Sequence, residues 1–221
     1  FQDLKKKKLR FIGNAEKRIK EDYLRILRFF RLIAELNLNY ENVEKNYLEV
    51  IRLHKDNLDI ISRERISSEF KRIFLSVDPT ISLELLEKAK IYKKFLGSFN
   101  KKRIKNLVFF EKKYKFFPKI ERRFLCLSIK NSGYILSRKE KKYFEVLKDS
   151  LGKMSDLKYL GFSLGFEKAL DCVVINAVRN DLKINDEELG FLKEGSKKIF
   201  PLTFSFISEK SNSEIAARER L

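Results

Sequence analysis

Hydrophobic residues recur with the spacing of an α-helix along most of this sequence. When each residue between 14 and 35 is rotated by 100° from the one before it, as in an α-helix, the apolar side chains fall within one stripe about 120° wide. Such a stripe is expected for a helix that packs on a core. Asn14 stands where its side chain can cap the first turn of this helix. The stripe consists of Ile19, Tyr23, Ile26, Leu27, Phe30, Ile33 and Ala34.

Further helical segments follow, separated by Pro, Gly and Ser residues that favour turns and helix ends. Only residues 9–12, ahead of Gly13, have the character of a short strand, and residues 205–221 lose the apolar periodicity. The sequence therefore predicts an all-α fold with a short N-terminal strand. The further predicted helices are 43–53, 64–74, 83–95, 100–113, 121–127, 139–147, 166–179 and 186–200.

Composition narrows the class of partner. The 221 residues include 49 Lys and Arg against 31 Asp and Glu, a net charge of +18. This excess argues against an ordinary neutral metabolic enzyme and favours a polyanion, either nucleic acid, a nucleotide or an anionic membrane surface. A membrane is the weaker alternative, because the basic residues are spread over many helices and not gathered on one amphipathic segment.

Cysteine usage and hydropathy indicate a cytoplasmic protein. The two cysteines, Cys126 and Cys172, stand in apolar runs with no histidine at ligand spacing, which is typical of buried thiols in a reducing compartment. No apolar stretch approaches the roughly 20 residues that span a bilayer, and no signal segment opens the chain. We expect no metal site and no membrane partner.

One helix face carries chemistry suited to a nucleotide. Asp22, Arg25, Arg28 and Arg31 recur every three residues, which on a single helix spans roughly 13 Å, about the length of an extended nucleoside triphosphate. A carboxylate beside a guanidinium can meet a base edge, and further arginines can reach phosphates. The alternative is a solvated basic face, with Asp22 paired to Arg18.

Residues 9–28, LRFIGNAEKRIKEDYLRILR, resemble the class II tRNA nucleotidyltransferase and bacterial poly(A) polymerase family, at the passage from catalytic head to helical neck. The family pattern E-D-x-x-R falls on Glu21, Asp22 and Arg25. The resemblance implies that Asp22 and Arg25 read the base of CTP or ATP and that Glu21 orients them. Arg28 and Arg31 would lie among the nucleotide-contacting arginines.

A second segment, residues 64–74, resembles the neck helix that braces this nucleotide template. Glu64, Arg65 and Glu69 are its matching residues. They could support the template helix, touch the nucleotide directly, or form ordinary pairs within their own helix. Weaker likeness continues at 165–171 and 200–203.

The resemblance also implies a division of the chain. Residues 1–13 would be a remnant of an α/β head, followed by the neck (14–76), the body (77–148) and the tail (149–221), whose end departs from the family pattern. The metal-holding D-x-D pair of the head is missing, because none of the ten aspartates stands two residues from another. We expect no catalytic residue here, no activity without the head, and Mg²⁺ only together with it.

Basic and aromatic residues interleave between Lys88 and Arg123, a pattern that suits RNA binding. Lys105, Lys119, Arg122 and Arg123 belong to this run. The alternative is a core of aromatics, including Phe109, with solvated lysines between them. The residues we select as RNA-binding candidates are Lys93, Lys94, Lys101, Lys102, Arg103, Lys112, Lys113 and Lys115.

Two other features carry less weight. Residues 161–165 spell G-x-S-x-G, but no strand precedes Gly161 and His54, the only histidine, lies upstream, so a turn between helices is the better interpretation than a hydrolase nucleophile. His54 itself suits a surface or helix-end position.

Two functions follow as hypotheses. The first is the nucleotide-selecting and RNA-binding part of an enzyme that adds CCA or A residues to RNA 3′ ends, with tRNA, ATP and CTP as partners and a head that is missing or separately encoded. The second is a non-catalytic all-α module for structured RNA, or a decayed remnant of such an enzyme.

Overall fold

A computed structural model describes residue 3 and residues 6–129, 136–152, 154 and 156–198. Within this part of the chain the regular elements are twelve α-helices and two short 3-10 helices, Tyr40–Asn42 and Lys55–Ile60. The predicted all-α fold is thus confirmed. The predicted N-terminal strand is limited to one parallel bridge between Leu9 and Val43. Residues 205–221 and 200–203 lie outside the described residues.

The chain divides into two compact units. The first contains residues up to 152 together with 171–184, and the second contains the remainder.

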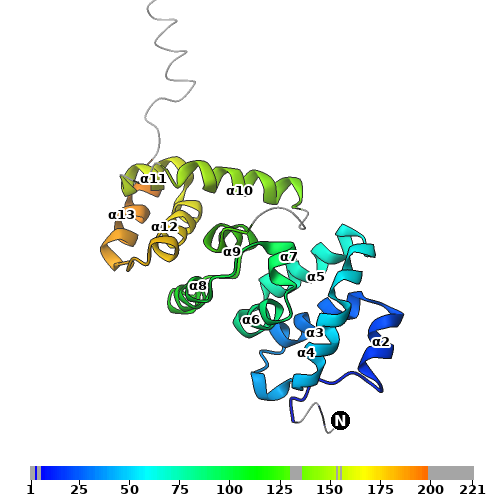
Figure 1. Cartoon of the computed structure of the whole chain (residues 1–221). Helices are drawn as coiled ribbons and strands as arrows, with labels where there is room; N and C mark the ends of the chain where they lie inside the picture. Colours follow the sequence, from blue (N-terminus) through cyan, green and yellow to red (C-terminus); the bar gives the residue numbers. More distant parts are fainter. Residues whose placement is uncertain (1–2, 4–5, 130–135, 153, 155, 199–221) are drawn as a thin grey trace, which may run out of the picture. The chain divides into compact units, whose positions relative to one another are not determined.

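The N-terminal helices of the first unit form around the predicted apolar stripe. The Asn14 side chain accepts the backbone N–H of Lys17 at 2.9 Å, which confirms the predicted cap. On α3, Ile26, Leu27 and Phe30 are fully buried, and this helix packs on α5 and α6 (Figure 1). The helices of this part are α2 (Ala15–Glu21), α3 (Leu24–Glu35), α4 (Lys45–His54) and α5 (Arg63–Leu75).

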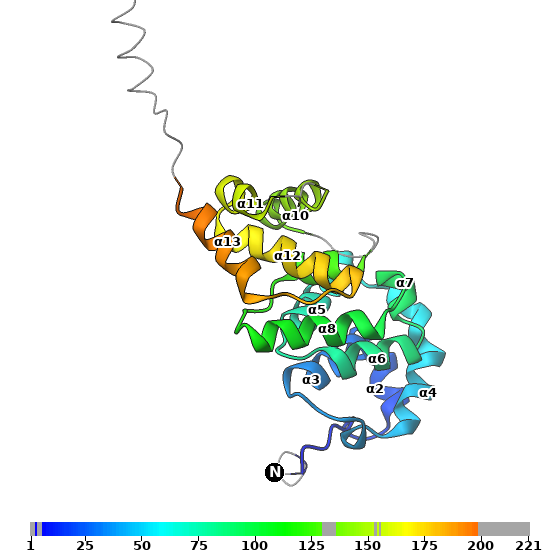
Figure 2. The same ribbon diagram turned by 90° about the vertical axis from the view of Figure 1, so that its left-hand side faces the viewer.

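The predicted helix over 83–95 is wrong as a single element, because the chain breaks it into two. Lys90 adopts a left-handed φ of 61°, and the N–H of Ile91 turns back to the carbonyl of Leu86 at 3.0 Å. This Schellman-like ending stops α6 before α7 begins. Figure 2 shows α8 beside α6. The helices concerned are α6 (Thr80–Lys88), α7 (Tyr92–Leu96), α8 (Lys101–Lys113), α9 (Ile120–Leu127) and α10 (Arg138–Ser150).

A buried ionic network joins several helices of the first unit. Arg122 and Arg123 on α9 are 2% and 0% exposed, and both bind Glu111 of α8. Arg122 also binds Asp171, which lies on α12 (Phe166–Asn180). Burial lowers the pKa of Arg122, but Asp171 and Glu111 outweigh it and hold that pKa above its ordinary value. The expectation that Arg122 and Arg123 belong to an RNA-binding surface is therefore wrong.

The second unit contains α11 (Leu157–Leu164), the first turn of α12, and α13 (Asp186–Ser196). Gly161 and Gly195 lie where α11 and α13 cross, so close that a Cβ on either would overlap backbone carbonyl oxygen of the other helix. The predicted turn over 161–165 is wrong in its greater part, because these residues continue α11 up to Gly165, whose φ is 75°. The close crossing of α11 and α13 thus accounts for the first glycine of the G-x-S-x-G motif.

Candidate functional site

The predicted nucleotide template begins at a break between two helices. Asp22 has an extended backbone, with φ −156° and ψ 102°, and it ends α2 instead of continuing into α3. Its carboxylate accepts the backbone N–H of Leu24 at 3.1 Å, a local bond that competes with the helix ladder. The prediction that one helix carries Asp22, Arg25, Arg28 and Arg31 is therefore wrong for Asp22. The three arginines share α3, and Arg25 to Arg31 spans about 9 Å of its axis.

Arg25 is held at this break by short bonds. Its guanidinium donates to Glu21 and to the backbone carbonyl of Arg18, each at 2.6 Å. Arg18 also pairs with Glu21, so the alternative pairing of Asp22 with Arg18 is not the arrangement found. The hydrogen bond from Arg25 keeps the pKa of Glu21 below its ordinary value. Glu21 thereby links the end of α2 to the first turn of α3.

The other two arginines turn toward α5. Arg31 Nη1 lies 2.9 Å from Glu69, and Arg28 Nε lies 3.5 Å from the same carboxylate. The Glu69 side chain is 8% exposed, whereas that of Arg28 is 46% exposed. Glu69 therefore anchors Arg31 firmly and leaves Arg28 largely in solvent, where it can meet an anion.

Arg65, one turn before Glu69 on α5, reaches the break itself. Its Nη2 lies 3.3 Å from the Asp22 carboxylate. Glu64 is exposed, and Arg72 pairs with Glu35 of α3 at 2.7 Å. Arg65 and Glu69 of α5 thus pair with predicted template residues, Arg65 with Asp22 and Glu69 with Arg28 and Arg31. Glu64 takes no part in these pairs.

This arrangement offers both kinds of hydrogen-bonding group that a base edge requires. Asp22 supplies acceptors, and Arg25 supplies guanidinium donors at the same break. Arg28 adds a solvent-facing positive charge further along α3. His54, the last residue of α4, places Nε2 3.3 Å from Glu16 of α2, which confirms the predicted helix-end position.

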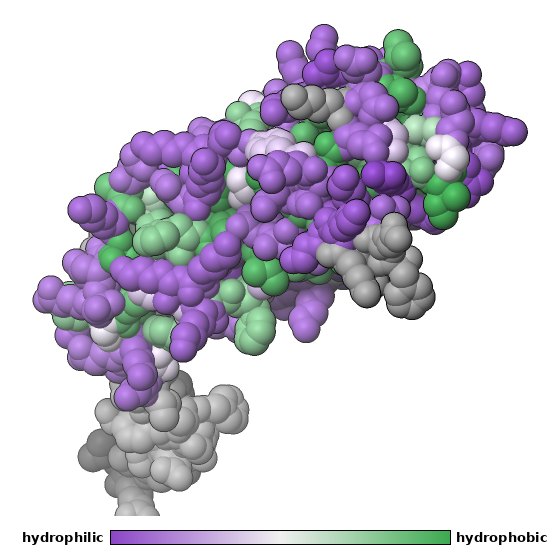
Figure 3. Space-filling model, turned by 90° about the horizontal axis from the view of Figure 1, so that it is seen from below, coloured by the Kyte–Doolittle hydropathy of each residue, from purple (hydrophilic) through white to green (hydrophobic). Residues whose placement is uncertain are grey.

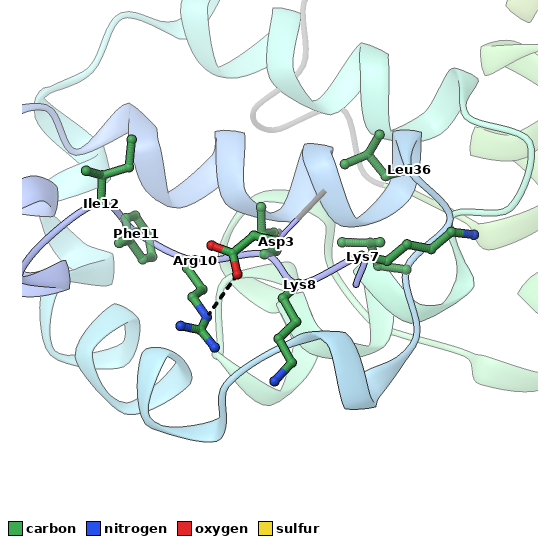
Figure 4. Close-up of a pocket in the computed structure, with 9 residues that line it drawn as sticks. Asp3, Lys7, Lys8, Arg10, Phe11, Ile12 and Leu36 are labelled. Carbon is green, nitrogen blue, oxygen red and sulfur yellow. Dashed lines mark ion pairs between the residues drawn. The ribbon is translucent and has the colours of Figure 1, made fainter. Parts of the chain in front are cut away.

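A separate cavity of about 620 Å³ lies along the N-terminal segment (Figure 4). Leu9, Phe11 and Ile12 contribute to it from the segment, and Leu36 and Leu38 from the end of α3 and beyond. Phe11 stacks on Phe29 of α3 with ring centroids 5.3 Å apart. None of the four template residues lines this cavity.

The RNA-binding candidates fall into three groups. Lys101, Lys102, Lys112 and Lys113 share the exposed side of α8, and Lys93 and Lys115 are exposed nearby in the sequence. Lys94 is held between Asp56 and Asp59, 3.1 and 2.7 Å away. Arg103 is half-buried and donates to Ser128 and to the carbonyl of Arg179, so it also serves the packing of its unit. Hydrophilic side chains cover most of the face seen in Figure 3.

Two residues of α8 gain importance from the structure. Lys105 is exposed and has no ion pair within the described residues, and Phe109 is 60% exposed. The interpretation of Phe109 as a core aromatic is wrong, although Phe110 beside it is only 7% exposed. The signal was available in the spacing, because positions 101, 105, 109 and 112 lie along one face of a helix.

Within the described ranges, no three His, Cys, Asp or Glu side chains come together as metal ligands. In the same ranges no helix is both long and apolar enough to cross a bilayer. The thiols of Cys126 and Cys172 are buried, and burial raises their pKa, that of Cys172 to about 12.

Comparison with known proteins yields a family match in the helical region. Residues 42–102 match the family described as the probable RNA and SrmB-binding site of polymerase A. The mitochondrial CCA tRNA nucleotidyltransferase 1 of Danio rerio is 42% identical over 86 residues, covering 39% of this chain and 20% of that protein. The CCA-adding enzyme of Streptococcus uberis is 36% identical over 101 residues, covering 46% and 24%.

Solved structures show the same fold over most of the chain. The Thermotoga maritima CCA-adding enzyme complexed with tRNA aligns with a TM-score of 0.59 and 14% identity, covering 94% of this chain and 56% of that one. A CCA-adding enzyme in complex with ATP aligns with a TM-score of 0.55 and 13% identity, covering 88% and 51%. The chain thus spans about half of these structures and about a fifth of the curated relatives that it matches.

The helical fold, with its arginine-bearing α3 braced by α5, is similar to the fold of solved CCA-adding enzymes. In sequence, parts of the chain are similar to CCA-adding enzymes and to the RNA-binding region of polymerase A, in agreement with the resemblance of residues 9–28 and 64–74.

Proposed function

We propose that this chain is the nucleotide-selecting and RNA-binding part of an enzyme that adds CCA or A residues to RNA 3′ ends. The observation that carries the proposal is the break between α2 and α3, where Asp22 and Arg25 stand together, supported by Arg65 and Glu21. Relatives solved with ATP, CTP and tRNA support the same assignment.

In this proposal Asp22 accepts from the exocyclic amine that cytosine and adenine share, and Arg25 donates to the ring acceptor beside it. Guanine and uracil present a carbonyl at the position of that amine and would face the carboxylate unfavourably. Arg28 and Arg31 would hold phosphates, and Glu69 would set their orientation. Glu64, which is exposed and apart from the template, would act through the neck helix only.

Chemistry would come from a head domain that carries the metal-holding carboxylates, on a further part of the protein or on a separate chain. Mg²⁺ bound there would neutralise charge on the phosphates during transfer. The described residues would contribute binding, orientation and choice of base. Residues 1–13, 14–76, 77–148 and 149–221 would correspond to the head remnant, neck, body and tail, in a cytoplasmic protein.

Nucleotide choice can be tested with the chain as it is. Equilibrium dialysis with the four labelled ribonucleoside triphosphates should show CTP and ATP bound in preference to GTP and UTP. Arg25→Ala should remove the preference, and Arg25→Lys should not restore it, because lysine lacks the guanidinium fork. Arg138→Ala, at an exposed arginine of α10, serves as the charge-matched control. Equal binding of all four nucleotides, or an Arg25→Ala variant with unchanged choice, would refute the assignment.

A further inference from the structure

The outward side of α8 has an unusual composition. Six of its residues are exposed, and five of them are lysines placed around one aromatic ring. Because residues three and four apart are neighbours on a helix, Lys105, Lys112 and Lys113 surround Phe109. The exposed residues are Lys101, Lys102, Lys105, Phe109, Lys112 and Lys113.

Charge on this side is only partly neutralised. Lys101 pairs with Glu84, Lys102 with Asp181 and Lys112 with Asp78. Lys105 and Lys113, by contrast, pair with no carboxylate among the described residues, and the Lys113 ammonium lies 4.9 Å from the centre of the Tyr114 ring. The two uncompensated lysines therefore stand at the i−4 and i+4 positions of Phe109, one helical turn before it and one after it.

Phe109 presents an aromatic ring to solvent. It is 60% exposed, and its inner neighbour Phe110 is buried, with ring centroids 5.8 Å apart and planes at 64°. An exposed phenylalanine alone is ordinary, but an aromatic face between two uncompensated cations matches the two components of a polynucleotide, a flat base and a charged backbone.

We propose that the outward side of α8 binds unpaired RNA, with one base stacked on Phe109 and the adjoining phosphates held by Lys105 and Lys113. This inference rests on the proposed RNA-binding function and assigns it a position and a mode. A paired RNA stem hides its base faces within the helix stack, so Phe109 adds affinity for single strands and little for duplex.

The chain contains no tryptophan, so Phe109→Trp introduces a single fluorescent reporter at the site. Adding a short oligoadenylate should quench its emission in a saturable manner, and an RNA duplex of equal length should not. Tyr159→Trp on α11 is the matched control, since Tyr159 is 61% exposed and has Asp156 three residues before it. Its emission should change little with either RNA.

Affinity gives the second readout. Phe109→Ala should weaken binding of the oligoadenylate about tenfold, Phe109→Tyr should preserve it, and both should bind the duplex as the parent does. Circular dichroism melts identical to the parent would show that each variant folds. Equal oligoadenylate affinity of Phe109→Ala and the parent would overturn the stacking mode. Binding of tRNA without any binding of the single strand would overturn it as well. In both cases the proposed RNA-binding function stands. Absence of binding to every RNA at low salt would overturn both proposals.

Discussion

At the scale of single residues, Arg123 is a fully buried cation that binds Glu111 and three backbone carbonyls. Its guanidinium donates to the carbonyls of Phe74 and Ser76 at 2.7 Å each, and to Val77 at 3.3 Å. These carbonyls lie at and just after the end of α5, where the helix dipole favours a positive charge. Arg123 thus fixes the end of the helix whose other side braces the arginines of α3.

Arg123→Met should destabilise the first unit by about 3–5 kcal/mol, because it leaves buried carbonyls and one oxygen of Glu111 without their donor. Urea unfolding followed by circular dichroism measures this loss. Arg138→Met, at an exposed position, should stay within about 0.5 kcal/mol of the parent. An Arg123→Met variant as stable as this control would contradict a structural role for the network.

At the scale of elements, the crossing of α11 and α13 depends on two glycines. A Cβ at Gly161 would overlap the carbonyl oxygen of Leu192, and a Cβ at Gly195 would overlap that of Lys158. Since both obstacles are backbone, the helices must separate to admit a methyl group.

Gly161→Ala or Gly195→Ala should therefore destabilise the second unit by roughly 1–3 kcal/mol or more. Gly190→Ala tests the same change on α13 where nothing lies within 4 Å, and it should stabilise by up to about 1 kcal/mol through helix propensity. Hydrogen exchange of the α11 and α13 amides reports the difference. Equal effects of all three substitutions would show that the close crossing is not required.

The start of α10 provides a test by pH. The Glu140 carboxylate accepts the backbone N–H of Ser137 at 2.8 Å and pairs with Lys71 of α5. Burial raises the pKa of Glu140, but Lys71 and the Ser137 N–H outweigh it, so the folded pKa lies below the ordinary 4.5. The carboxylate therefore stabilises the fold above pH 4.5, and this stabilisation is lost as the pH falls through the folded pKa.

Glu140→Gln keeps the cap and removes the charge. At neutral pH the parent should be more stable by up to about 1 kcal/mol, and this difference should vanish on acidification below pH 4.5. Unfolding curves of both proteins over a pH series measure it. A difference that stays constant into acid would exclude the charge as its source.

At the scale of the whole molecule, the basic residues behind the net charge of +18 differ in whether a carboxylate pairs with them. Template arginines and many lysines are bound to carboxylates, whereas Lys105 and Lys113 are uncompensated among the described residues. A diffuse positive charge attracts any polyanion, but only lysines that contact phosphates change how affinity depends on salt.

The double variant Lys105→Gln with Lys113→Gln should lower the slope of log affinity for oligoadenylate against log salt by about 1.4. Lys141→Gln with Lys142→Gln removes the same charge from exposed positions on α10 and should leave the slope unchanged. Filter binding over a salt series distinguishes them. Equal slopes for the two double variants would indicate that the charge acts diffusely.

The amino-acid sequence by itself determined the fold class and the choice of candidate site residues. Helical spacing predicted the all-α fold and the buried stripe of α3, because amphipathic repeats are local and a core must cover them. The resemblance of residues 9–28 and 64–74 singled out the template residues and two of the side chains that reach them, Arg65 and Glu69.

Tertiary structure decided which of these side chains meet. Asp22 leaves the helix because its carboxylate bonds a nearby N–H, a competition that apolar periodicity does not register. Arg122 and Arg123 resemble Lys112 and Lys113 in sequence, yet the first pair is buried against Glu111 and the second is exposed. Burial of a charge depends on a partner distant in the chain, so only the packed fold separates the arginines that hold it together from the lysines that remain exposed to solvent.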